Sequence, residues 1–318
     1  MSSFTDRQKL FDQLATHRKR KLVTLVTSTK KPENLFAAQI AQDILPVFYD
    51  IFRGRTHEDK LDLLIYSSGG QIDTPWPLVN LIREYYDELH IIVPWRAHSA
   101  ATLIALGGDT IGMGPLGSLS PIDPQLQVKL VDKKEVVNAG IEDIYGYYSL
   151  IQDQLKLDAS GTAEALKVLA NRIEPEILGK VSRMRREIRV IAMNLLRLHL
   201  KDENKINSIV TSLVEELPSH QYMINRNEAL AIGLPVGQLD ERSEMLSFQI
   251  LNSYINEARM DEPGMPVDLD TDETSKVVEM SRAFVETAGR SFAFRTSYTF
   301  HKDGKWETKI NRWMEVTG

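Results

Sequence analysis

Between residues 61 and 114, short apolar runs alternate with stretches in which apolar residues recur every three or four positions. Short continuous runs are typical of parallel strands buried on both faces, and the wider spacing is typical of helices packed on such a sheet. Strands are therefore expected at 61–66, 90–95 and 110–114, and helices at 73–89 and 99–108. This order implies right-handed crossovers and a parallel sheet, so the predicted fold class is α/β.

Helical spacing also dominates two other parts of the chain. One is residues 35–52, and the other begins after residue 130. The later helices are expected at about 141–157, 162–171, 176–201 and 204–216. Opposite the apolar stripe of the third one lie five arginines, which we interpret as a solvated or subunit-facing surface. They are Arg183, Arg185, Arg186, Arg189 and Arg197.

The sequence of residues 258–318 indicates an extension separate from the main domain. Residues 258–275 are rich in acid, proline and glycine and are expected to form a linker. A helix is expected to follow the linker, with Asp270 as its N-terminal cap and Gly289 at its end. The alternation around KDGK, residues 302–305, predicts a β-hairpin. We therefore expect one domain over 1–257, with a helical insertion at about 141–216, and an extension over 258–318 made of linker, helix and hairpin.

Composition narrows the classes of function. The net charge of -6 argues against nucleic acid or an anionic membrane surface as the main partner. The absence of cysteine excludes disulfides, thiolate zinc sites and a cysteine nucleophile, and it fits a reducing compartment. No apolar run approaches the length of a membrane span, and the first residues are polar where a signal peptide is apolar. A cytoplasmic protein without a metal or cofactor is expected.

Ser99 stands where a nucleophile is often found, between a predicted strand and the predicted helix at 99–108. A serine hydroxyl attacks a carbonyl only when a base takes its proton and nearby donors hold the oxyanion that forms. The start of a helix leaves backbone N–H groups free, so the N–H of Ala100 is a candidate donor. A serine at this position also serves simply as a helix cap, and that alternative stays open.

A second donor is expected from Gly69 and Gly70, which follow the strand at 61–66. Glycine adopts backbone angles closed to other residues and presents its amide without a side chain. In a parallel sheet the carboxyl ends of neighbouring strands meet at one edge, where open α/β sheets bind their ligands. The glycine pair and Ser99 are therefore expected to lie together, although a simple tight turn explains the glycines equally well.

Three stretches together resemble the serine dehydrogenase proteinase family, a branch of the superfamily of the Clp protease proteolytic subunit, signal peptide peptidase A and the crotonases. The stretches are 64–72 (LIYSSGGQI), 96–125 (RAHSAATLIALGGDTIGMGPLGSLSPIDPQ) and 219–236 (SHQYMINRNEALAIGLPV). The resemblance implies a Clp protease/crotonase-like ββα spiral, homo-oligomers, Ser99 as nucleophile and an oxyanion hole formed by the Gly69–Gly70 turn and Ala100.

The general base departs from the family pattern. Where Clp-type members place a histidine, within a segment like SPIDPQ, this chain has Asp123. His220 lies in the stretch that resembles the one carrying their aspartate, so we predict a swapped arrangement in which His220 is the base and Asp123 orients it. His98 is expected to point away from Ser99. A lysine base is the alternative, and the lysines in question are Lys129, Lys133 and Lys134.

The predicted function is a serine peptidase that cleaves peptide or protein substrates by acyl transfer through Ser99. Two other functions stay open. A crotonase-like enzyme would use the same amide pair to polarise a thioester without a nucleophile. A binding or scaffold protein would keep the fold and lack the chemistry, as the missing Clp-type histidine suggests.

Overall fold

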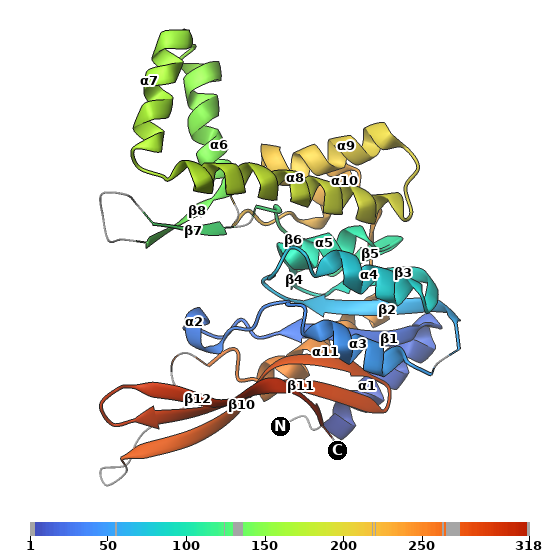
Figure 1. Ribbon diagram of the computed structural model, residues 1–318. Helices are drawn as coiled ribbons and strands as arrows, with labels where there is room; N and C mark the ends of the chain where they lie inside the picture. Colours follow the sequence, from blue (N-terminus) through green and yellow to red (C-terminus); the bar gives the residue numbers. More distant parts are fainter. Residues whose placement is uncertain are drawn as a thin grey trace.

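The computed structural model describes residues 4–54, 56–123, 125–129, 136–217, 219, 221–262, 264 and 274–316. Within this part of the chain, eight strands form one large sheet in the order β12-β11-β10-β1-β2-β3-β5-β9 (Figure 1). In chain order these strands are β1 Lys21–Thr27, β2 Glu58–Tyr66, β3 Tyr86–Val93, β5 Thr110–Met113, β9 Val236–Gln238, β10 Ser275–Thr287, β11 Arg290–His301 and β12 Trp306–Val316.

Helices cover both faces of the sheet and form an arm beside it. The described helices are α1 Phe4–Arg18, α2 Glu33–Phe36, α3 Ile44–Phe52, α4 Pro75–Arg83, α5 Ala100–Leu106, α6 Ile141–Ser149, α7 Ala159–Ala170, α8 Pro175–Arg197, α9 Glu203–Thr211, α10 Arg226–Ile232 and α11 Glu241–Glu257. No helix in the described part of the chain combines the length and the apolar content that a membrane crossing needs.

The parallel half of the sheet agrees with the sequence pattern. β1, β2, β3, β5 and β9 pair in parallel, with α4 and α5 as the crossovers that were expected between strands. Pro75 begins α4, where its missing N–H costs no helical hydrogen bond. The α/β fold class is therefore confirmed, with β10 to β12 adding an antiparallel half.

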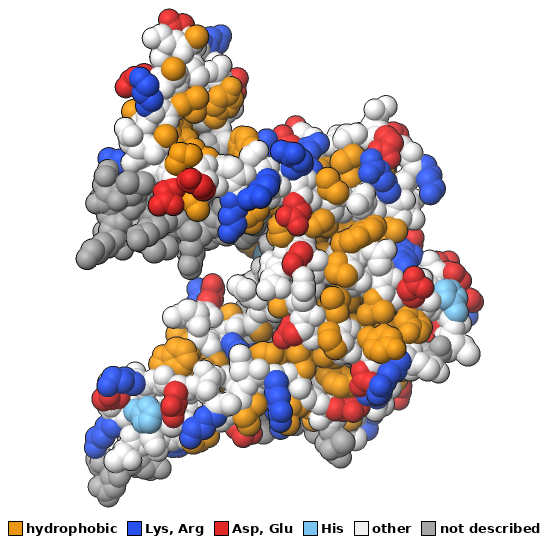
Figure 2. Space-filling view, in the orientation of Figure 1, with side chains coloured by type: hydrophobic (Ala, Val, Ile, Leu, Met, Phe, Trp, Pro, Cys, Tyr) orange, Lys and Arg blue, Asp and Glu red, His pale blue; other side chains and the backbone are white. Residues whose placement is uncertain are grey.

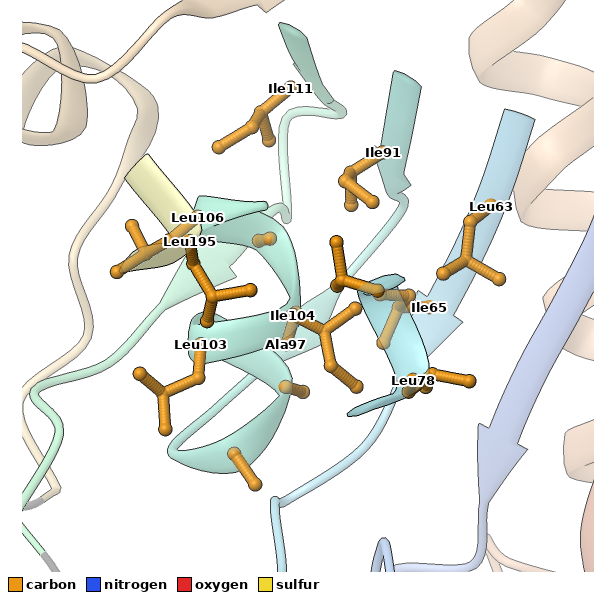
Figure 3. Close-up of a cluster of buried hydrophobic side chains, with 14 of the residues drawn as sticks. Leu63, Ile65, Leu78, Ile91, Ala97, Leu103, Ile104, Leu106, Ile111 and Leu195 are labelled. Atoms are coloured by element: carbon orange, nitrogen blue, oxygen red, sulfur yellow. The ribbon is translucent and has the colours of Figure 1, made fainter. Parts of the chain in front are cut away.

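Both faces of the parallel strands are buried, which explains their continuous apolar sequence. Leu63 and Ile65 of β2 face the core under α3, α4 and α5, while Leu64 and Tyr66 face the core under α1 and α11. Figure 3 shows the first core, with Leu195 of α8 packed beside the side chains of α5. The fully buried α5 thus holds the segment that begins at Ser99 in one place.

The predicted helical insertion is present and forms an arm. α6 and α7 project from the molecule as a helical hairpin, and α8 runs back along the body (Figure 1). A two-stranded sheet of β7 (Gln125–Lys129) and β8 (Val136–Gly140) lies at the base of the arm. Figure 2 shows a hollow in this face, between the arm and the C-terminal strands. The arrowhead of β2 points toward it in Figure 1, so the carboxyl edge of the sheet borders the hollow.

The helix predicted over 35–52 is present only in part. α2 ends at Phe36 and α3 begins at Ile44. Between them, the N–H of Ile40 donates to the carbonyl of Gly69, and the N–H of Gln71 donates to the carbonyl of Ile40. This bridge to the glycine turn requires an extended backbone, and it therefore overrides the helical spacing of the local sequence.

The helix predicted from Asp270 to Gly289 is wrong. Residues 275–287 form the long strand β10, which pairs antiparallel with β1 over Val23–Thr27. The hairpin around residues 302–305 is present, and it joins β11 to β12. Asp270 itself lies outside the described residues. The C-terminal strands therefore extend the same sheet as the parallel strands, because pairing with β1 outweighs a local capping pattern.

His90, on β3, is expected to make the unfolding free energy of the protein fall at acidic pH. Burial, with smaller contributions from Arg18 and Arg20, lowers its pKa from 6.5 to about 3. The folded protein therefore holds a neutral imidazole, and its stabilising contribution is complete above pH 6.5 and lost as the pH falls toward 3. We expect this residue to remove about 2 kcal/mol of unfolding free energy between pH 6.5 and 5.

The measurement is urea unfolding at pH 7 and pH 5, for the wild type and for His90→Gln. The glutamine variant keeps a polar side chain that does not titrate, so its loss of stability between the two pH values should be smaller by that amount. His301→Gln is the matched control, because the side chain of His301, on β11, is partly exposed. Equal losses in the wild type and His90→Gln would contradict the expectation.

Candidate active site

Ser99 joins the short strand β4 (Arg96–Ala97) to α5 with an unusual backbone conformation. Its φ is 52° and its ψ is -115°. Positive φ is uncommon for residues other than glycine and costs of order 1–3 kcal/mol, so it persists only where the surroundings impose it. The side chain makes no capping hydrogen bond to α5 and is 7% exposed. The alternative in which Ser99 serves as a helix cap therefore does not describe its geometry.

The structure brings the Gly69–Gly70 turn directly against Ser99. The end of β2 runs beside β4, with the N–H of His98 donating to the carbonyl of Ser67 at 3.0 Å. A Cβ atom at Gly69, whose φ is 112°, would lie 2.6 Å from Ser99 Cβ. A Cβ atom at Gly70 would lie 2.0 Å from the carbonyl oxygen of Ile40. Neither position has room for a side chain, so the two glycines allow the three chain segments to meet.

The amides of the two glycines differ. The Gly69 N–H donates to Ser67 Oγ at 3.0 Å, so it is already occupied. Among the described residues, the structure records no acceptor for the N–H of Gly70 or of Ala100. Gly70 directly follows Gly69 in the sequence, and Ala100 directly follows Ser99, the residue against which Gly69 packs. Of the amides predicted to form an oxyanion hole, that of Gly69 is thus taken by Ser67, and those of Gly70 and Ala100 have no recorded acceptor among the described residues.

His98 points toward a different serine. Its Nε2 lies 3.0 Å from Ser118 Oγ, on the short strand β6 (Ser118–Leu119) that pairs with β4. Ser118 also donates to the carbonyl of Trp95 at 3.3 Å. This agrees with the expectation that the side chain of His98 points away from Ser99.

Asp123 is buried at the base of the arm. Its Oδ1 accepts the N–H of Glu142 at 3.2 Å, and the carboxylate packs against Gly140 at the start of α6. Glu142 in turn accepts from Arg185 at 2.7 Å, while burial raises the pKa of the Glu142 carboxyl. These contacts place Asp123 as an acceptor for the first turn of α6, on the segment that also carries Ser120.

His220 lies outside the described residues, and so do Lys133 and Lys134. Of Lys129, only the backbone in β7 is described. The chain on both sides of His220 runs beside the segment that precedes Asp123. Ile224 exchanges two backbone hydrogen bonds with Leu119, and the N–H of Ile122 donates to the carbonyl of Leu213. The choice between a histidine and a lysine base stays a prediction.

Two serines that support the site were missed in the sequence. Ser67 Oγ accepts the N–H of Gly69 and the hydroxyl of Thr27. Ser120 Oγ accepts the N–H of Ser99 at 2.8 Å. Both lie inside the stretches quoted above, next to the glycine turn and the PIDPQ segment. The contacts of Ser67 with Thr27 and of Ser120 with Ser99 join residues far apart in sequence and leave no local signal.

The described residues contain no group of three histidine, aspartate or glutamate side chains that could hold a metal ion.

The described chain is a mixed α/β protein in which a serine with a strained backbone lies between the short strand β4 and α5. No protein-family model matches it. An uncharacterized protein of Methanocaldococcus jannaschii is 27% identical over a 191-residue alignment that covers 58% of this chain. The match spans 56% of that archaeal protein.

Proposed function

We propose that the protein is a serine hydrolase that cleaves peptide bonds with Ser99 as its nucleophile. The observation that carries this proposal is the backbone of Ser99, held at a φ of 52° against the Gly69–Gly70 turn. Strain of this kind clusters at active sites, where it aims a side chain that would otherwise relax. The choice of a polypeptide as substrate rests on the motif resemblance.

The reaction follows from the groups present. Ser99 Oγ attacks the scissile carbonyl and passes its proton to the base, which we take to be His220, with Asp123 as its orienting partner. The amides of Gly70 and Ala100 donate to the oxyanion of the tetrahedral intermediate. The base then protonates the departing amine, and water attacks the acyl-enzyme by the same route.

The proposed fold is a Clp protease/crotonase-like spiral. This proposal is supported by a second, two-stranded sheet of β4 and β6, in which β4 directly precedes Ser99 and α5 in the sequence. We also propose a cytoplasmic homo-oligomer. That part rests on the motif resemblance and on the absence of cysteine.

The first prediction concerns Ser99 itself. A fluorophosphonate probe should label the wild-type protein, and Ser99→Ala should abolish the labelling, because the probe bonds covalently only to an activated serine oxygen. Ser208→Ala, at an exposed serine of α9, is the control and should label like the wild type. Labelling is measured by intact-protein mass spectrometry.

An unlabelled wild type would contradict the hydrolase proposal. If that protein still bound an acyl thioester, the crotonase-like reading would take its place. Failure to bind either compound would favour the scaffold reading.

The second prediction concerns the base. His220→Gln is expected to slow labelling by at least about 100-fold, the contribution typical of general acid–base catalysis. Lys129→Met, Lys133→Met and Lys134→Met should label at the wild-type rate. Should one of the three lysine variants lose labelling while His220→Gln retains it, the base is that lysine. The pH dependence of the labelling rate provides a second measurement, because histidine and lysine titrate in different ranges.

A further inference from the structure

The strained backbone of Ser99 needs a restraint, since nothing in its own side chain supplies one. A serine that begins a helix ordinarily takes a β-region backbone and turns its oxygen to the N–H of the second or third helical residue. Ser99 makes no such bond. If its backbone were free to relax, the hydroxyl would cap α5 and leave the sheet edge. Some contact must therefore hold the N–H of Ser99 in its present direction.

Ser120 makes that contact. Its Oγ accepts the N–H of Ser99 at 2.8 Å, and its hydroxyl hydrogen is donated to the carbonyl of Pro121 at 2.9 Å. The Ser120 side chain is 1% exposed, so water does not compete for either bond. Because the hydrogen is committed to Pro121, the oxygen faces Ser99 only as an acceptor.

Thr102 holds Ser120 in place. The N–H of Ser120 donates to Thr102 Oγ1 at 3.1 Å, and the Thr102 hydroxyl donates to the carbonyl of Ala97 at 2.8 Å. Thr102 is fully buried in α5. The bonds therefore run from β4 through α5 to the segment after β6 and return to Ser99. They close a ring around the residue whose conformation they fix.

We propose that Ser120 is a positioning residue for Ser99, and this inference rests on the proposed function. Ser120 fixes the peptide plane before Ser99 and so keeps the Ser99 oxygen from turning onto its own helix. It also determines the direction of the Ala100 N–H, because the same backbone angles of Ser99 orient both groups. Ser120 itself does not contact the substrate.

The test compares Ser120→Ala, Ser120→Thr and Ser118→Ala. Ser118 is the matched control, since it is a buried serine two residues away whose bonds go to His98 and Trp95. Fluorophosphonate inactivation is measured over a range of probe concentrations, which separates the limiting rate from probe affinity. Ser120→Ala should lower the limiting rate at least tenfold at unchanged affinity. Ser120→Thr, which keeps the hydroxyl, should stay within about threefold of wild type, and so should Ser118→Ala.

Amide hydrogen exchange of Ser99 provides a measurement that does not depend on hydrolysis. Exchange should accelerate in Ser120→Ala and remain slow in Ser118→Ala. Unchanged exchange and an unchanged limiting rate in Ser120→Ala would overturn the inference, and so would equal slowing in Ser118→Ala. If Ser120→Ala does not fold, Thr102→Val takes its place, and a wild-type limiting rate in that variant would overturn it. An unlabelled wild type whose Ser99 exchange still depends on Ser120 refutes the hydrolase alone.

Discussion

Replacing Arg7 with methionine is expected to lower the unfolding free energy by about 3–5 kcal/mol, the cost of breaking a buried ion pair from one side. The guanidinium of Arg7 is 1% exposed and donates to both carboxylate oxygens of Glu286, at 2.8 and 2.6 Å. It also donates to Glu257 at 2.8 Å and lies 4.2 Å from the ring centre of Tyr254. These bonds join α1, α11 and β10 at the centre of one face of the sheet.

The loss in Arg7→Met follows from the carboxylate that remains. Glu286 is fully buried, and without Arg7 the donors recorded for it among the described residues are the uncharged hydroxyls of Ser291 and Tyr254. The double variant Arg7→Met/Glu286→Met should therefore recover most of the stability, because it removes both charges together. Glu257→Gln is the control and should cost less than about 1 kcal/mol, since Glu257 is partly exposed.

Urea unfolding followed by circular dichroism measures all four proteins. A loss below about 1 kcal/mol in Arg7→Met would mean that the pair is solvated in solution. If the double variant is no more stable than Arg7→Met, the Arg7–Glu286 pair stabilises the fold through its packing and not through its charges.

Replacing Gly70 with alanine is expected to destroy the site and to cost about 3 kcal/mol or more, at the upper end of overpacking effects. The added Cβ would lie 2.0 Å from the carbonyl oxygen of Ile40 and 2.5 Å from its nitrogen. Both contacts are with backbone, so no side-chain rotation relieves them. The Ile40 segment has to leave the glycine turn, and the oxyanion donor proposed at Gly70 is then displaced.

Fluorophosphonate labelling of Gly70→Ala should fall by at least about 100-fold, as expected when an oxyanion donor is lost. Gly179→Ala, on α8, is the matched control, because its added Cβ meets nothing within 4 Å. That variant should label normally and unfold at the same or a slightly higher urea concentration. Wild-type labelling in Gly70→Ala would exclude this turn from the site.

The fold was predictable from the sequence where local spacing and tertiary structure agree. The parallel strands and α8 follow their periodicity because each buries a face that its own residues define, whereas α7 follows its helical spacing without burying a residue. The prediction was wrong for β10, since the acidic sequence that precedes it has the pattern of a helix cap and its pairing with β1 is nonlocal. It was incomplete for residues 37–43, where Ile40 leaves the helical path to bridge Gly70.

The candidate site divides in a similar way. The position of Ser99 and its glycine neighbours could be predicted because parallel strands bring their carboxyl ends to one edge. The backbone strain of Ser99 could not, since it depends on a bond to Ser120, twenty-one residues later. The occupied amide of Gly69 could not either, because it depends on the rotamer of Ser67.

The pairing of β1 with β10 has a consequence for how the protein is made. β1 is synthesised more than 240 residues before β10, the strand that covers its free side. Until β10 has been made, the nascent sheet has an open edge at β1, and the guanidinium of Arg7 lacks the carboxylate of Glu286. Messages truncated before residue 275 should therefore yield aggregated product, and chaperone dependence should disappear only when the final strands emerge.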